Sequence, residues 1–233
     1  MPDGIRSQRG AGALSRPRGG DTGAATAVLG VADHNGWAVC VTVADGGRLP
    51  VVVDRRRIEL IAPGLPSQPY HHEALGMSLA AAEALVARVR TSVMETTLAR
   101  LSELRDELQR SYAIVAMTIR TPPLSYVPVT VAEAHASYPV MCRADGMMYH
   151  DALCTTAARL GMTVELIERG AEAARAAESR GVRLADVEQL LDAAGESLGA
   201  PWRQEHRAAA AAAMAVLAGY TAARPSSRRA LPS

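Results

Sequence analysis

Three runs of strand-forming residues joined by two tight turns constrain the fold of this chain most strongly. Residues 25–32 are small and apolar, residues 37–43 alternate strand formers, and residues 51–61 make a third run. The connections at residues 34–36 and 44–47 each place Asn or Asp before Gly, which favours tight turns because these residues accept positive φ cheaply. The chain is therefore predicted to begin its folded part with an antiparallel three-stranded meander.

Two further strands are each reached across a helix. Residues 79–108 keep a helical spacing of Leu and Val, and residues 130–160 are helical with a predicted break at Pro139. Residues 112–119 form a near-continuous apolar run, typical of a strand covered on both faces, and residues 162–167 form a fifth strand. The meander and these two strands predict a mixed five-stranded sheet.

The remaining elements complete an α/β order of β-β-β-α-β-α-β-α with extra helices at the end. The late helices are expected at residues 171–180, 184–197 and 203–220. We assign residues 24–220 to one domain, because 233 residues suit a single domain with tails. Residues 1–23 are expected to be a disordered basic arm and residues 221–233 a disordered tail, since neither has a hydrophobic period.

Charge and cysteine content limit the classes of function. The net charge is +1, which argues against a strongly basic nucleic-acid-binding body, although a local basic patch remains open. Cys40, Cys142 and Cys154 form no CxxC pair, so a disulfide framework or zinc knuckle is not expected and a reducing cytoplasm is the predicted location. No signal peptide and no membrane-spanning run is expected.

Residues 30–39, Gly-Val-Ala-Asp-His-Asn-Gly-Trp-Ala-Val, resemble the opening of RuvC-type resolvases, in which a strand ends in a catalytic Asp and returns through a Gly. The element order resembles the ribonuclease-H-like fold over most of residues 25–220. The chain also resembles a bacterial family with no established activity. That family shares this opening, an Arg-rich third strand, a His-His loop and a late Pro-Trp-x-x-acid-His segment.

The resemblance implies a nucleic-acid-processing protein with a site for Mg²⁺ or Mn²⁺. Such a site takes carboxylates from the first strand, the end of the fourth strand and the last helix. Asp33 matches the first position and Glu205 the last, and His34 or His206 would move protons. The fourth strand departs from this pattern, because it ends in Thr-Ile-Arg where an acid is expected.

The missing acid leaves two hypotheses open. One is a divalent-metal-dependent nuclease with a degenerate site. Asp145 is a candidate to replace the missing acidic ligand, although nothing in its spacing along the sequence requires that role. The other is a non-catalytic binding or scaffolding domain of the same fold. Asp33 and His34 also suit turn hydrogen bonding, and Glu205 also suits the first turn of a helix, where its charge favours the dipole.

Three further features have both a functional and a structural interpretation. Arg55, Arg56 and Arg57 are either a phosphate-contacting rib or charges that protect an edge strand; Arg55 and Arg57 are expected to share one strand face. His71 and His72 fit a ligand or phosphate contact, or packing of a loop. A glycine inside the helix at residue 146 predicts close approach of another backbone.

Overall fold

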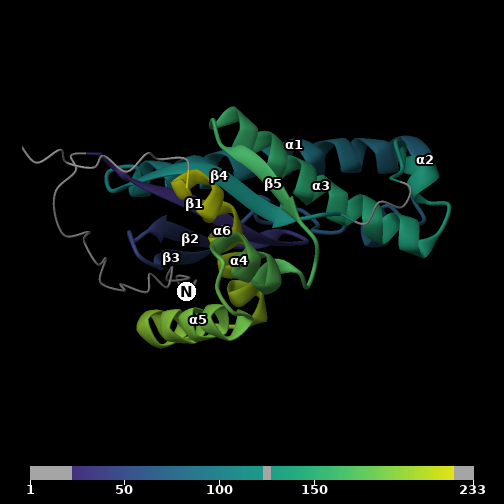
Figure 1. Ribbon diagram of the computed structural model, residues 1–233. Helices are drawn as coiled ribbons and strands as arrows, with labels where there is room; N and C mark the ends of the chain where they lie inside the picture. Colours follow the sequence, from purple (N-terminus) through teal and green to yellow (C-terminus); the bar gives the residue numbers. More distant parts are fainter. Residues whose placement is uncertain (1–22, 123–126, 223–233) are drawn as a thin grey trace, which may run out of the picture.

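A meander of three antiparallel strands forms one side of the sheet (Figure 1). The computed structural model describes residues 23–122 and 127–222. β1 (Ala25–His34) pairs antiparallel with β2 (Trp37–Asp45), and β2 pairs antiparallel with β3 (Pro50–Glu59). Both turns predicted from Asn-Gly and Asp-Gly lie between these strands, so the sequence located the meander correctly.

Two parallel strands complete the sheet. β4 (Tyr112–Arg120) pairs parallel with β1, and β5 (Thr163–Ile167) pairs parallel with β4. The strand order is β3-β2-β1-β4-β5, which is the mixed five-stranded sheet of the ribonuclease-H-like fold. The fold class predicted from the order of elements is confirmed. β1 and β4 therefore end at the same edge of the sheet.

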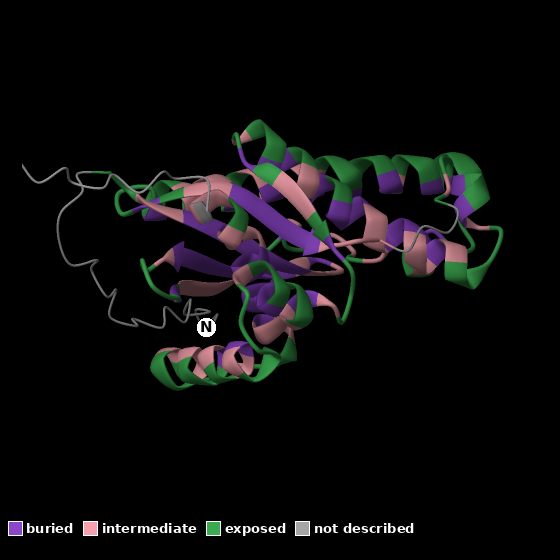
Figure 2. Ribbon diagram, in the orientation of Figure 1, coloured by how far each residue is buried: buried purple, intermediate pink, exposed green. Residues whose placement is uncertain are grey.

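Two long helices cover one face of the sheet (Figures 1 and 2). The N-cap of α1 (Leu79–Leu108) is Ser78, whose side chain accepts a hydrogen bond from the N–H of Ala81. The short α2 (Val131–Ala134) and then α3 (Tyr138–Arg159) follow β4. The core under α1 and α3 is built mainly from Leu, Val, Met and Ala, because the chain has no Phe.

Three helices cover the opposite face: α4 (Glu172–Arg180), α5 (Leu184–Leu198) and α6 (Gln204–Ala222). α6 lies directly on β1 and β2 (Figure 1). The two backbones approach closely at Gly30, where a Cβ atom would overlap the main chain of Ala209. A run of alanines on α6 makes this tight packing sterically feasible.

The structure differs locally from the sequence predictions. The helix break lies before Pro139, which occupies the first turn of α3, where proline costs no hydrogen bond. The loop at residues 69–73 forms a single π-helical turn, η1 (Pro69–Glu73). A Cβ atom added at Gly146 would meet no other atom within 4 Å, so the prediction of a close backbone approach there was wrong. The close backbone approach lies at Gly30 instead. α6 also runs past residue 220, to Ala222.

The expected disordered segments lie outside the described residues, apart from Gly23 and the last two residues of α6. Cys40, Cys142 and Cys154 are all free thiols, as their spacing indicated. Within residues 23–122 and 127–222, no helix combines the length and apolar character needed to cross a bilayer.

Candidate functional site at the carboxyl ends of β1 and β4

Asp33 and His34 point to opposite faces of the sheet at the end of β1, although both line the same cavity there. Val31 packs in the core beneath α1 and α3, whereas Ala32 packs in the core beneath α6, so successive β1 side chains point to opposite faces. Asp33 therefore lies on the α3 side. His34 lies on the α6 side and stacks on Trp37, with ring centroids 3.9 Å apart.

The end of β4 brings an arginine to Asp33. The Nη2 atom of Arg120 lies 3.8 Å from Oδ1 of Asp33 and 3.4 Å from its carbonyl oxygen. Both side chains are only partly exposed, at 26% and 20%. This contact follows directly from the parallel pairing of β1 and β4, which ends the two strands together. The position at which the resemblance expects a second acid thus holds a cation that lies beside the Asp33 carboxylate.

His150 of α3 extends this cationic region. Its Nε2 atom lies 3.2 Å from the carbonyl oxygen of Arg120, and because a carbonyl can only accept, Nε2 carries a proton. Nδ1 lies 3.8 Å from a carboxylate oxygen of Asp151 and 3.7 Å from the Cys154 sulfur. The Asp151 carboxylate, together with Cys154, raises the pKa of His150 above its ordinary value, although burial opposes the shift. This shift favours the protonated, cationic form of His150.

These groups line a cavity of about 620 Å³, within the usual range for small-molecule sites. Strand ends β1 and β4 form one wall and α3 forms another, and Arg169 follows β5. Its cationic side chains come from the end of β4, from α3 and from the segment after β5: Arg120, Arg143, His150 and Arg169. Of the described residues that line it, Asp33 alone carries a carboxylate. We call this cavity the strand-end pocket. Its chemistry favours an anionic ligand.

α3 contributes one face to the strand-end pocket. Cys142, Arg143, Gly146, Met147 and His150 recur there at helical spacing. Arg143, His150 and Arg169 were not predicted as site residues from the sequence, and the arginine that ends β4 was interpreted only as a missing acid. The spacing of three to four residues between these side chains can be recognised in the sequence. The site that they line can be identified only once the parallel pairing of β1 and β4 is known.

Glu205 and His206 belong to the other face of the sheet. Neither lines the strand-end pocket, although Glu205 lies near His34. His206 is buried, and its Nδ1 accepts a hydrogen bond from the N–H of Arg203 at the start of α6. Burial lowers the pKa of His206, which keeps the ring neutral and suited to this accepting role. Its observed contacts are those of a helix cap.

The donor set does not fit a divalent cation. Within the described ranges, no three His, Cys, Asp or Glu side chains are grouped closely enough to hold a metal ion. Mg²⁺ and Mn²⁺ require several oxygen ligands, whereas Asp33 is paired with a guanidinium group. His34 adds no charge, because burial and Arg120 lower its pKa and the carboxylates of Asp33 and Glu205 offset this only in part.

The three arginines of β3 all have partners within the protein. Arg55 donates to the carbonyl oxygens of Gly199 and Pro201 in the loop before α6. Arg56 forms two hydrogen bonds with Asp54 at 2.8 Å and one with Glu107 of α1. The guanidinium carbon of Arg57 lies 4.1 Å from the Trp37 ring centroid.

The faces of these arginines are as predicted. Arg55 and Arg57 share the α6 side, whereas Arg56 points toward α1. Because β3 is an edge strand, the contacts also agree with the structural interpretation of this charge cluster.

His71 and His72 lie in η1 and stack with ring centroids 4.0 Å apart. His71 also packs edge-on against Tyr138 and lies 3.8 Å from the Cys142 sulfur. Asp145 is fully buried beneath this turn. Its Oδ1 atom accepts the N–H of Tyr70 at 3.1 Å, so Asp145 holds η1 against α3.

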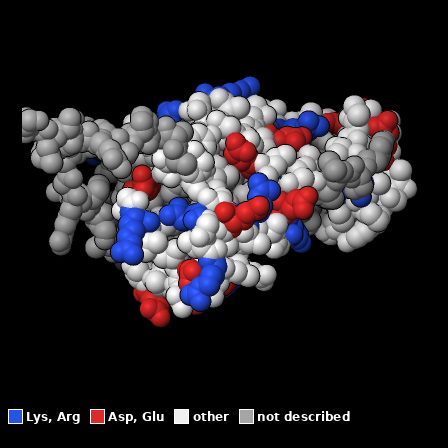
Figure 3. All heavy atoms as spheres, in the orientation of Figure 1, with Lys and Arg blue, Asp and Glu red and all other residues white. Residues whose placement is uncertain are grey.

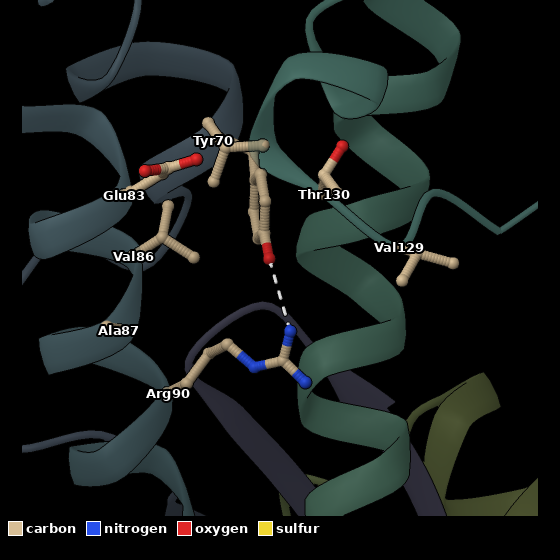
Figure 4. Close-up of a pocket in the computed structure, with 8 residues that line it drawn as sticks. Tyr70, Glu83, Val86, Ala87, Arg90, Val129 and Thr130 are labelled. Atoms are coloured by element: carbon tan, nitrogen blue, oxygen red, sulfur yellow. Dashed lines mark hydrogen bonds between the residues drawn. The ribbon is translucent and has the colours of Figure 1, made fainter. Parts of the chain in front are cut away.

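A second cavity, of about 290 Å³, lies between α1 and α2 (Figure 4). Tyr70 projects between the helices, and its hydroxyl faces the guanidinium of Arg90 at 3.5 Å. The wall is otherwise mainly apolar and includes one acid, Glu83, so this cavity lacks the excess positive charge of the strand-end pocket. The surface seen in Figure 3 carries acidic and basic groups interspersed, without one continuous basic face. Of these two cavities, the strand-end pocket is the one lined by several cationic side chains.

Comparisons with known proteins find a similarity of backbone structure without a matching sequence family. A Thermus thermophilus RuvC in complex with a Holliday junction substrate aligns with a TM-score of 0.49 and 12% identity, over 85% of this chain and 96% of that chain. A second Thermus thermophilus RuvC structure aligns with a TM-score of 0.49 and 11% identity, over 84% and 96%. No protein-family model and no curated protein sequence matches this chain.

Proposed function

We propose that this protein is a nucleic-acid-binding domain that uses the ribonuclease-H-like fold without two-metal hydrolysis. The observation that carries this proposal is Arg120 at the end of β4, with its guanidinium against Asp33. A cation at that position opposes a divalent ion and attracts a phosphate group. Arg143, Arg169 and His150 add positive charge to the same pocket. A cytoplasmic location, inferred from the three free thiols, belongs to this proposal.

The proposal predicts that Arg120→Gln weakens nucleic-acid binding about tenfold, equivalent to roughly 1.4 kcal/mol. The loss is expected to be similar across sequences, and the dependence of log affinity on log salt should become shallower by about one unit. Fluorescence anisotropy with labelled single-stranded, duplex and branched DNA, and with hybrid duplexes, at two salt concentrations measures both quantities.

Arg100→Gln is the matched control, because Arg100 is an exposed arginine paired with Glu103 on α1, outside the strand-end pocket. It should bind as the wild type does. Thermal unfolding of both variants separates lost affinity from lost folding. Wild-type protein that binds none of these nucleic acids, or an Arg120→Gln variant that binds as tightly as Arg100→Gln, would contradict the proposal.

The alternative is a divalent-metal-dependent nuclease with Asp33 and Glu205 as Mg²⁺ or Mn²⁺ ligands. The observation in its favour is the placement of Asp33 at the end of β1, where its carboxylate lines a cavity. Cleavage of any of the tested nucleic acids in the presence of Mn²⁺, lost in Asp33→Asn, would establish this alternative.

A further inference from the structure

The strand-end pocket is larger than one phosphate group requires. Its volume of about 620 Å³ corresponds to roughly twenty water volumes of ~30 Å³ each. A bare phosphate would leave most of this space to solvent. A phosphate that carries a sugar and a base fills it better, because such a ligand has roughly twenty non-hydrogen atoms of comparable packing size.

The lining is divided between charge and apolar surface. Arg120, Arg143 and His150 supply positive charge, whereas Pro122 and Met147 supply apolar contacts. The α3 wall is open at Gly146, where an added Cβ would meet nothing within 4 Å. A glycine inside a helix costs about 1 kcal/mol relative to alanine, and here its absence of a side chain leaves room in the pocket.

The number of positive groups favours a terminal phosphate over an internal one. A phosphomonoester carries a charge of about −1.5 to −2 at neutral pH, whereas a backbone phosphodiester carries a charge of about −1. Arginines and His150 line the pocket together with a single lining carboxylate, that of Asp33, and His150 also lies 3.8 Å from the carboxylate of Asp151. A lining of this kind attracts a dianion more strongly than a monoanion.

We propose that the strand-end pocket binds a nucleoside 5′-monophosphate group, either as the 5′-phosphorylated end of a nucleic acid or as a free nucleotide. The arginines and His150 hold the phosphate, and the wall around Gly146, Met147 and Pro122 holds the nucleoside. This assignment rests on the proposed function and specifies which part of a nucleic acid the pocket takes.

Calorimetric titration of the full chain with adenosine 5′-monophosphate, adenosine and inorganic phosphate tests the ligand class. The nucleotide should bind at least tenfold more tightly than either fragment. A 5′-phosphorylated oligonucleotide should likewise bind about tenfold more tightly than the same strand with a 5′-hydroxyl. These two arms distinguish a free nucleotide from a strand end as the source of the group.

Gly146→Leu tests the location, because the new side chain would occupy the pocket while every charge is retained. It should abolish nucleotide binding and the preference for a 5′-phosphate. The matched control is Gly219→Leu, on exposed α6 backbone where an added Cβ also meets nothing; this variant should behave as wild type. Thermal unfolding confirms that both variants fold.

The outcomes separate the two proposals. Polymer binding that depends on Arg120 but shows no preference for a 5′-phosphate would overturn this inference and leave the proposed function standing. Nucleotide binding that Gly146→Leu abolishes, without binding of any polymer, would support the pocket assignment and overturn nucleic-acid binding as the function. Nucleotide binding unaffected by Gly146→Leu would overturn the assignment.

Discussion

The carboxyl group of Asp145 is fully buried, yet only one of its oxygens has a hydrogen-bond partner among the described residues. Oδ1 accepts the N–H of Tyr70, whereas Oδ2 has none. Burial raises the pKa of Asp145 to about 7, and the backbone hydrogen bonds from Tyr70 and His71 offset this only partly. The group is therefore protonated in the folded protein over a pH range in which it is ionised in the unfolded chain.

Stability should consequently rise as the pH falls from about 7 to about 4, because the unfolded carboxyl has a pKa of about 3.9. The folded state binds more protons throughout this window, so the contribution is complete below about pH 4 and is lost as the pH rises through about 7. The expected slope from Asp145 is on the order of 1 kcal/mol per pH unit. Urea unfolding across this window measures it.

Asp145→Asn should remove this component, because the amide keeps an acceptor for Tyr70 but does not titrate. The comparison variant is Asp106→Asn, an exposed carboxylate on α1 that pairs with Arg105. It should retain the wild-type pH dependence. Equal pH dependence in wild type and Asp145→Asn would show that Asp145 does not titrate in this window.

Two glycines in regular elements have opposite roles. Gly30 lets β1 and α6 approach closely, since a Cβ there would overlap the carbonyl oxygen of Ala209. Gly146 has open space beside it. Sequence alone marks both as glycines inside an element and cannot tell them apart, because the difference lies in which element packs against each. This explains why the predicted backbone approach was assigned to the wrong glycine.

Gly30→Ala should destabilise the protein by about 3 kcal/mol or more, because neither backbone can yield without separating α6 from the sheet. This corresponds to a fall in Tm of roughly 6–12 °C for a chain of this size. Gly146→Ala should instead raise the unfolding free energy by up to about 1 kcal/mol. Thermal unfolding of the two variants compares them directly, and equal Tm values would refute the close packing.

The contacts of β3 show how an edge strand is tied to its surroundings. Arg55 reaches the loop that leads into α6, Arg56 reaches α1, and Arg57 covers Trp37. The alternation of their faces followed from the strand period. However, Arg55 and Arg56 each also contact a residue 51 or more positions away in the sequence. Local sequence could therefore predict the direction of each side chain and not what it contacts.

At the scale of the whole molecule, the fold was predictable because its signals are local. The turn residues, the apolar strand runs and the helical spacing of α1 each identify an element, and the order of elements defines the sheet. The site was less predictable because it depends on pairing between distant segments. Asp33 was correctly placed at the end of β1, but its contact with Arg120 required the parallel register of β1 and β4.

Titration calorimetry with Mn²⁺ tests most directly whether the strand-end pocket selects anions. The wild-type protein should show no saturable binding, because Arg120 places a positive charge beside Asp33 where a second acidic ligand would be needed. Arg120→Asp, which places an acid at the end of β4, should create saturable Mn²⁺ binding that a second substitution, Asp33→Asn, removes. Saturable binding of Mn²⁺ to the wild type that Asp33→Asn abolishes would contradict the account and place a metal ion at the end of β1.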